Sequence, residues 1–183
     1  MADVVRLLTT EEVDTEGHQP QINLDSFVQT AQGIFEATKV GHFNYTALLF
    51  CIYLEDQAAI IFLEAIKQWK KAIADKDIDD ILGAAFITFA GFQQVKKGLP
   101  ACEDVNPHSL DWTHFDKIVA AMEDPEKHMV KIGENIVFNG KTVTKEIKEA
   151  GEALNAGNYE DFGFQVGSFL ETAVEGSAEQ FLF

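Results

Sequence analysis

The sequence lacks the motifs by which most enzymes and membrane proteins are recognised. It has no glycine-rich phosphate loop, no GxSxG nucleophile elbow and no paired Cys–His pattern. Its longest apolar run, residues 81–92, is shorter than the roughly 18 residues that a transmembrane helix needs. We therefore expect no catalytic residues, no cofactor and no membrane span.

Basic residues are scarce. Fourteen Lys and Arg face 30 Asp and Glu, which gives a formal net charge of −16. A surface this acidic repels phosphate backbones and anionic lipids, so nucleic acid is an unexpected partner and so is an anionic membrane. Basic partners and divalent cations remain open alternatives, and plain solubility is the simplest interpretation of the charge.

No leader peptide is visible either. Residues 1–10 contain one basic residue and no continuous apolar segment, which does not fit a secretory signal. The sequence alone therefore indicates an intracellular protein, or a mature or re-engineered form of a secreted one.

What the sequence does contain is helical periodicity. Apolar residues recur every three or four positions from Leu24 onward, and no segment alternates with the period of a strand. We expect an all-α fold of about seven helices in stacked antiparallel hairpins, either a bundle or a short α-solenoid. The expected helices are 24–41, 43–75, 77–97, 109–124, 125–139, 142–156 and 158–174. We expect residues 24–183 to form a single helical domain behind a polar arm, residues 1–23.

Short segments at the expected helix–helix corners resemble one another. Residues 72–81 and 153–162 match closely, residues 37–43 fit the same frame, and residues 120–126 fit it weakly. Self-similarity of this kind is typical of helical repeats, although short hairpin loops can also resemble one another by chance.

The shared corner has a simple physical interpretation. A glycine, Gly41 or Gly157, takes the left-handed conformation that closes the first helix. Asp77 or Asn158 then caps the next helix at once. The sequence thus predicts tight turns between antiparallel helices at these positions.

This corner, followed by an apolar helix and a cysteine in residues 89–102, resembles segments of small helical proteins that are common in ciliates and other protists. The resemblance covers roughly residues 62–102 and 142–174. Those proteins are mostly secreted and uncharacterised, and they carry a leader that this chain lacks. The resemblance implies a fold more than a function.

Only two cysteines are present, Cys51 and Cys102. They lie at similar distances before and after the predicted turn at residues 75–76, so an antiparallel hairpin would bring them to a similar height. A disulfide is the first interpretation, and two buried reduced thiols are the second. An oxidised pair would favour a secreted or surface location, and reduced thiols would favour the cytoplasm.

One glycosylation sequon, Asn44-Tyr45-Thr46, follows the first predicted corner. It matters only if the chain is secreted, because the modifying enzymes act on secreted proteins. Asn44 is therefore a conditional glycosylation candidate.

Histidine and acidic residues come closest together around His108 and His114, near Asp111 and Asp116. A spacing of six residues does not place two histidines on one helical face, and no HExxH motif occurs. We expect surface histidines and no metal site. Glu146, Glu149 and Glu152 are interpreted in the same way, as a solvated helix face among lysines.

Aromatic residues are concentrated in two of the predicted helices. Small residues accompany them in the later helix, so the set could line a cavity for a lipid, haem or pigment. The alternative is a packed aromatic core. The residues are Phe50, Phe62, Trp69, Phe86, Phe89 and Phe92.

Two further features bear on packing and assembly. Gly163 and Gly167, four residues apart on an apolar helix, predict a close helix crossing. The apolar segment Phe181–Phe183 and the polar arm 1–23 suggest contacts with other molecules.

From these observations we expect a non-enzymatic structural or assembly subunit, part of a secreted or surface filament or complex. Self-association, or joining a larger protein assembly, would use the arm and Phe181–Phe183. The alternative function is a carrier of a hydrophobic small molecule between helices.

Overall fold

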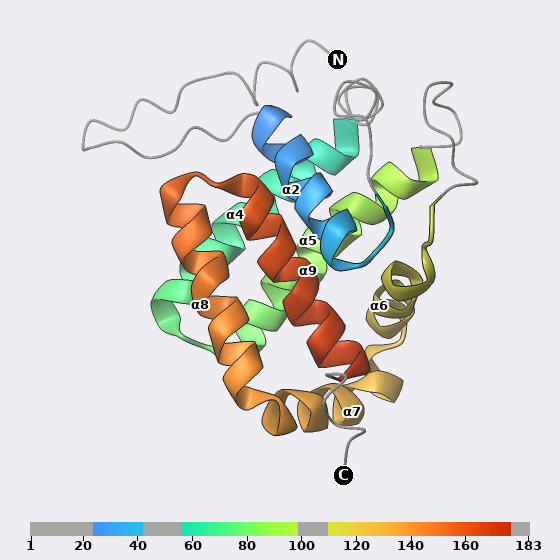
Figure 1. Ribbon diagram of the computed structural model, residues 1–183, viewed down its shortest axis with the longest axis vertical. Coiled ribbons are helices and arrows are strands. Elements are labelled where there is room, and N and C mark those ends of the chain that lie inside the picture. Colours follow the sequence, from blue (N-terminus) through green and yellow to red (C-terminus); the bar gives the residue numbers. More distant parts are fainter. Residues whose placement is uncertain (1–23, 42–55, 99–109, 177–183) are drawn as a thin grey trace.

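The computed structural model describes residues 24–41, 56–98 and 110–176, and this part of the chain forms seven helices and no strand (Figure 1). The expected all-α fold is confirmed. No helix among the described residues is long and apolar enough to cross a membrane. The helices are α2 (Leu24–Ala37), α4 (Asp56–Asp75), α5 (Ile78–Gly98), α6 (Thr113–Glu123), α7 (Pro125–Phe138), α8 (Gly140–Ala156) and α9 (Tyr159–Glu175).

Helix α9 lies in the middle of the molecule. Figure 1 shows α8 along one side of it, α6 on the other side and α7 across its end. Apolar side chains recur along α9 and bury against the surrounding helices; they include Phe162, Val166, Phe169, Leu170 and Ala173. A helix that is apolar on most of its circumference is stable only when neighbours cover it, which explains its central position.

Two pairs of consecutive helices form the expected hairpins, α4 with α5 and α8 with α9. At the second corner Gly157 is left-handed (φ 71°), and the Asn158 side chain accepts a hydrogen bond from the Asp161 backbone N–H at 3.3 Å. At the first corner Asp77 Oδ1 accepts the Asp79 backbone N–H at 2.8 Å. The predicted caps at both corners are confirmed.

The prediction for Gly41 is wrong in position. Helix α2 ends at Ala37, and the left-handed residue that closes it is Lys39 (φ 58°). The backbone N–H groups of Lys39 and Val40 donate to the carbonyls of Glu36 and Phe35, at 3.0 and 2.9 Å, which is the Schellman arrangement. Gly41 has a positive φ of 123° but lies beyond this closure. Because a lysine, Lys39, occupies the left-handed position where glycine is usual, the sequence did not indicate where helix α2 ends.

Helix α2 packs chiefly against α9, the last helix, and the two run in the same direction. Gly163 lies against Thr30 near the start of this contact, and Gly167 lies against Ala37 at its end. A Cβ atom on Gly163 would come within 2.1 Å of the Thr30 carbonyl oxygen, so the two backbones touch only because glycine has no side chain. The close helix crossing predicted from Gly163 and Gly167 is confirmed.

The interior between α2, α4, α5 and α6 is filled with aromatic rings. Phe27 lies 5.0 Å from both Phe62 and Phe92, measured between ring centroids. Phe89 stacks on Phe115 at 5.0 Å. Such centroid distances are typical of favourable aromatic pairs, so these rings support one another in a shared core.

Several sequence predictions fall outside the described residues. They are the arm at residues 1–23, the first part of the predicted helix 43–75, Asn44, Phe50, Cys51, Cys102, His108 and Phe181–Phe183.

Candidate functional site

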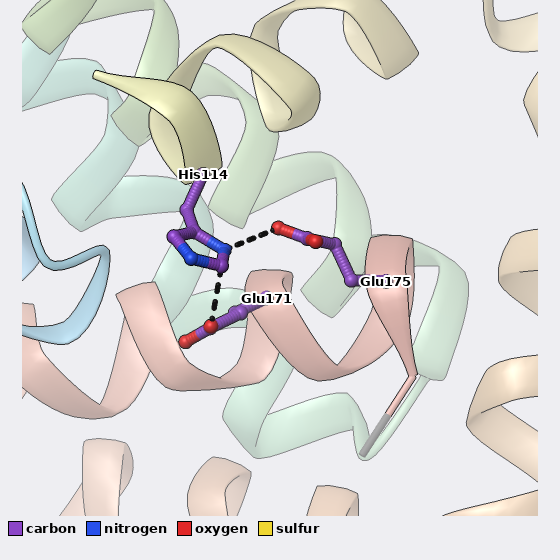
Figure 2. A group of neighbouring side chains, drawn as sticks. All are labelled: His114, Glu171 and Glu175. Atoms are coloured by element: carbon purple, nitrogen blue, oxygen red, sulfur yellow. Dashed lines mark hydrogen bonds and ion pairs between the residues drawn. The ribbon is translucent and has the colours of Figure 1, made fainter. Parts of the chain in front are cut away.

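Three ionisable side chains meet where α6 crosses the second half of α9. His114 Nδ1 lies 2.7 Å from Glu175 Oε1 and 3.4 Å from Glu171 Oε1. Figure 2 shows the imidazole of α6 pointing between the two carboxylates of α9. Glu171 and Glu175 are four residues apart, so the helical repeat places them on one face of α9. All three side chains are partly buried.

Two lysines complete this cluster from either side. Lys39, at the end of α2, donates to Glu171 Oε1 at 2.7 Å, and Lys117 of α6 binds Glu175 Oε2. Two ammonium groups therefore balance the two carboxylates, whatever the charge on His114. The cluster joins three segments that are far apart in sequence.

The pKa of Glu175 follows from these contacts. Partial burial alone would raise it, but hydrogen bonds from Lys117 and His114 outweigh burial and hold the pKa below its ordinary value. Glu175 therefore carries its negative charge at neutral pH and stays paired.

An imidazole and two carboxylates are also a ligand set for a transition metal ion, and their ligand atoms lie within 4.8 Å of one another. A metal ion here would have to displace Lys39 and Lys117 from the carboxylates that they already bind. The arrangement is better suited to holding α6 and α2 against α9 than to binding a cation.

A buried carboxyl of α8 lies against Thr172, the residue that follows Glu171 in α9. Glu146 of α8 accepts a hydrogen bond from Thr172 Oγ1 at 3.1 Å, and its other oxygen, Oε2, is buried without a hydrogen-bond partner. Burial raises the pKa of Glu146 to about 7, and the nearby charge of Glu171 adds to the effect. The interpretation of Glu146 as a solvated surface residue is wrong, because α9 covers it.

Its two neighbours on α8 do behave as surface residues. Glu149 lies 3.8 Å from Lys145 and Glu152 lies 3.5 Å from Lys148, both as exposed pairs one helical turn apart. Such pairs contribute little to stability. One residue of the predicted charged face is thus buried while the other two are solvated.

Helix α7 has more exposed large apolar side chains than any other described helix. Val130, Val137 and Phe138 are 73, 78 and 76% exposed, and Met129 is about half exposed. We refer to these four residues as the α7 apolar face. At about 100° per residue, Val130 and Val137 share one side of this 14-residue helix, and Met129 and Phe138 lie about 80–100° to either side of them. Exposed apolar residues are ordinary when scattered, but four on one helix suit a partner surface.

The opposite side of α7 is fixed to α9 by a buried amide. Asn135 Nδ2 donates to the backbone carbonyls of Ala173 and Val174, at 3.0 and 3.2 Å. These carbonyls belong to the last turn of α9, where no further helical N–H can reach them. Asn135 thus fixes which side of α7 faces inward.

The aromatic residues proposed as a ligand pocket lie in the core wherever they are described. Phe62, Trp69, Phe89 and Phe92 are fully buried, and Phe86 is partly buried beside them. Trp69 packs edge-on against Phe162 at 5.5 Å and donates its Nε1–H to Thr88 Oγ1 at 3.0 Å. A groove of about 480 Å³ lies elsewhere, on the surface between α8 and α9, and polar and acidic residues such as Glu149, Glu152 and Asp161 line much of it.

Sequence reasoning missed Glu171, Glu175 and the α7 apolar face. The two glutamates had a visible signal, since they are a pair of acids one turn apart near the end of an otherwise apolar helix. Val130 and Val137 are seven residues apart on a face that also carries Glu126 and Glu134, so their polar surroundings masked the stripe. His114 was noted, but with Asp111 and Asp116; Asp111 instead accepts hydrogen bonds from Thr113, and Asp116 binds Lys96.

Comparison with known proteins gives one family. Residues 11–173 match the model of the SctB-like family, described as secreted protein B-like. Neither the curated proteins nor the solved structures contain a significant match.

Proposed function

The chain belongs to the SctB-like family, and from this membership and its surface we propose that it is a non-enzymatic structural subunit of a secreted assembly. The family description gives the secreted setting, and the proposal adds self-association. The narrower resemblance to hairpin-repeat proteins of ciliates and other protists is part of the same proposal. The two matching corners at Asp77 and Asn158 support it.

The α7 apolar face is the observation that carries this proposal. A secreted protein with a net charge of −16 has ample polar surface to keep its outer helices hydrophilic. Exposing Val130, Val137 and Phe138 therefore has a cost in solubility, and a partner surface that covers them removes that cost.

The carrier alternative has less support. The aromatic side chains that would line its pocket contact other rings of the core, as Trp69 does with Phe162. The groove between α8 and α9 has acidic and amide side chains, which do not suit a lipid or pigment.

A secreted setting gives two sequence features a role. Cys51 and Cys102 would be paired in an oxidising compartment, and Asn44 would be open to glycosylation. Both proposals concern residues outside the described part of the chain.

Native mass spectrometry of the full chain, purified from its source without reducing agent, tests the function. Masses at multiples of the chain are expected. A monomer at all accessible concentrations would overturn the assembly proposal, and a monomer with a constant added mass of a few hundred daltons would favour the carrier. The same spectrum reports whether two hydrogens are missing, as a Cys51–Cys102 disulfide requires.

A further inference from the structure

We propose that α7 packs against α7 of a second copy of this chain, in an antiparallel two-fold contact in which Val130 of each copy faces Val137 of the other. The inference rests on the proposed assembly function and names the surface through which two copies meet. Three observations on described residues lead to it: the spacing of the exposed valines, the unpaired charges of α7 and the open surroundings of its glycine.

The two valines point away from their own molecule. Helix α7 lies at one end of the molecule, across the end of α9 (Figure 1). Its inner side is fixed by Asn135, which donates to the last turn of α9. At about 100° per residue, Val130 and Val137 lie roughly 140–160° around the helix from Asn135, which agrees with their exposure of 73 and 78%.

The spacing of the valines defines a register. Val130 and Val137 are seven residues apart, so they lie on one side of α7 and about 10 Å from each other along its axis. When two such helices run antiparallel, the shift that places Val130 opposite Val137 of the other copy also places Val137 opposite Val130. The face is therefore complementary to itself, as an isologous contact requires.

The charged side chains of α7 have no ionic partner among the described residues of their own copy. They are two glutamates and two lysines, all exposed: Glu126, Lys127, Lys131 and Glu134. On α8, by contrast, Lys145 and Lys148 each pair with a glutamate one turn further on. Because its charges sum to zero in a chain of net charge −16, α7 is a place where two acidic copies repel each other little.

The proposed register pairs two of these charges across the contact. Glu134 and Lys131 lie roughly 40° and 100° around the helix from Val130, on the same flank. An antiparallel two-fold pair brings this flank of both copies together, and Lys131 of one copy then lies within about 3 Å, along the axis, of Glu134 of the other. The two lysines and two glutamates form a neutral group of four beside the valines, and such complementarity fixes register.

Gly133 lies on the opposite flank and faces its counterpart in the second copy. A Cβ atom on Gly133 would meet nothing within 4 Å among the described residues, so packing within one copy does not call for glycine. Glycine inside a helix is less favourable than alanine. In the two-fold contact, the missing side chain lets the two α7 backbones come close together.

The expected contact is weak. One pair of helices buries less than the roughly 800 Å² per partner of a standard interface, so we expect a dissociation constant in the micromolar range. An isologous contact closes after two copies. The dimer is therefore the unit from which a larger assembly would be built.

Charge reversal in the full chain tests the pairing. Lys131→Glu makes the group of four wholly negative, and Glu134→Lys makes it wholly positive. Each single variant should dimerise at least about tenfold more weakly than the original chain at low salt, as measured by analytical ultracentrifugation. The double variant Lys131→Glu/Glu134→Lys restores opposite charges and should dimerise like the original chain.

A mixture of the two single variants gives the most specific result. One variant then brings only negative charges to the group and the other brings only positive ones, so the mixed dimer is favoured over both pure dimers. It should exceed the half of all dimers that random association gives. Native mass spectrometry counts the three dimers when one variant is isotopically labelled.

Two further variants separate this contact from general effects. Lys148→Glu changes the net charge as Lys131→Glu does, but on an exposed part of α8, and it should dimerise like the original chain. Val137→Asp spoils the apolar part of the contact and should weaken the dimer at least about tenfold. Circular dichroism should show unchanged helix content in all variants, because every substituted residue is exposed.

Other outcomes would overturn the proposal, each in a recognisable way. If the double variant is as weak as the single ones, or the mixture does not favour the mixed dimer, Lys131 and Glu134 do not face each other. If the original chain assembles and no α7 variant weakens it, the assembly function stands and this interface is wrong. If the original chain is monomeric at all accessible concentrations, both proposals fail; a lower melting temperature of Val137→Asp would then show that the face is covered within one copy.

Discussion

The first half of α9 approaches its neighbour α2 with glycine, and the second half adds polar and charged contacts with its neighbours to its buried apolar ones. At Gly163 the two backbones touch, with room for no side chain between them. At Glu171 and Glu175 the helix is instead connected to its surroundings through His114, Lys39 and Lys117. One helix thus uses two unlike kinds of contact within 17 residues.

The two halves of α9 therefore depend on different interactions: the first half depends on close packing of backbones, and the second half also depends on charged groups. Close-packed backbones respond strongly to added volume and hardly at all to pH or salt. Partly buried ion pairs and the buried Glu146 respond to both, because their stability depends on protonation and screening. We therefore expect the two halves of α9 to fail under different perturbations, and three predictions test this.

The largest effect is expected from Gly163→Ala. The new Cβ would lie 2.1 Å from the Thr30 carbonyl oxygen and 2.9 Å from its Cα, and neither atom belongs to a movable side chain. The two helices must separate, which should lower the free energy of unfolding by about 3 kcal/mol or more. Urea denaturation at pH 7 measures the change.

Gly83→Ala is the matched control. Gly83 is also a helix-interior glycine, but a Cβ there would meet nothing within 4 Å. The substitution should be neutral or stabilise the protein by up to about 1 kcal/mol, because alanine favours the helix. Equal destabilisation by both changes would contradict the close crossing.

The glycines of α9 and of the corner before it also show how far the sequence can predict the fold. The helices follow from apolar periodicity, and the corner at Gly157 follows from a glycine before a capping Asn158. Gly163 and Gly167 predicted a close crossing, but nothing local identifies α2 as the partner. Pairing the first described helix with the last depends on which surfaces fit in space, and no spacing along the chain encodes that.

The second prediction concerns the pH dependence that Glu146 adds to the second half of α9. Its folded pKa, about 7, is above the ordinary value of 4.5, so the folded state holds this proton more tightly than the unfolded state does. The stability that it contributes is fully present below pH 4.5 and is lost as pH rises to about 7. By linkage the loss amounts to about 3 kcal/mol at most.

Glu146→Gln should remove this dependence while keeping the bond from Thr172. The variant should match the original chain near pH 4 and exceed its stability above pH 7. Glu149→Gln, on the same helix but in an exposed pair with Lys145, should change stability by less than about 0.5 kcal/mol. Urea titrations between pH 4 and 8 give all three curves. Parallel curves for the original chain and Glu146→Gln would show that the carboxyl is hydrated.

Burial of Glu146 is the part of this region that the sequence conceals. Glu146, Glu149 and Glu152 recur every third residue among lysines, which is the ordinary pattern of a solvated face. At about 100° per residue, however, Glu152 lies about 240° around the helix from Glu146, so their side chains point in different directions. Covering Glu146 depends on the position of α9 over α8, which is a tertiary property.

The smallest effect isolates one ion pair of the cluster. Lys39 and Lys76 both follow a helix in the left-handed conformation, with φ of 58° and 56°, where glycine is less strained. Replacing either with glycine should relieve about 1 kcal/mol of strain and removes the same charge.

Lys39 also binds Glu171 at 2.7 Å, whereas Lys76 has no ion pair among the described residues. Lys76→Gly should therefore stabilise the protein by about 0.5 kcal/mol more than Lys39→Gly at low salt. The gap should close in 1 M NaCl, where screening acts within about 3 Å. A gap that persists at high salt would mean that Lys39 stabilises the junction by packing of its methylene chain instead of by its charge.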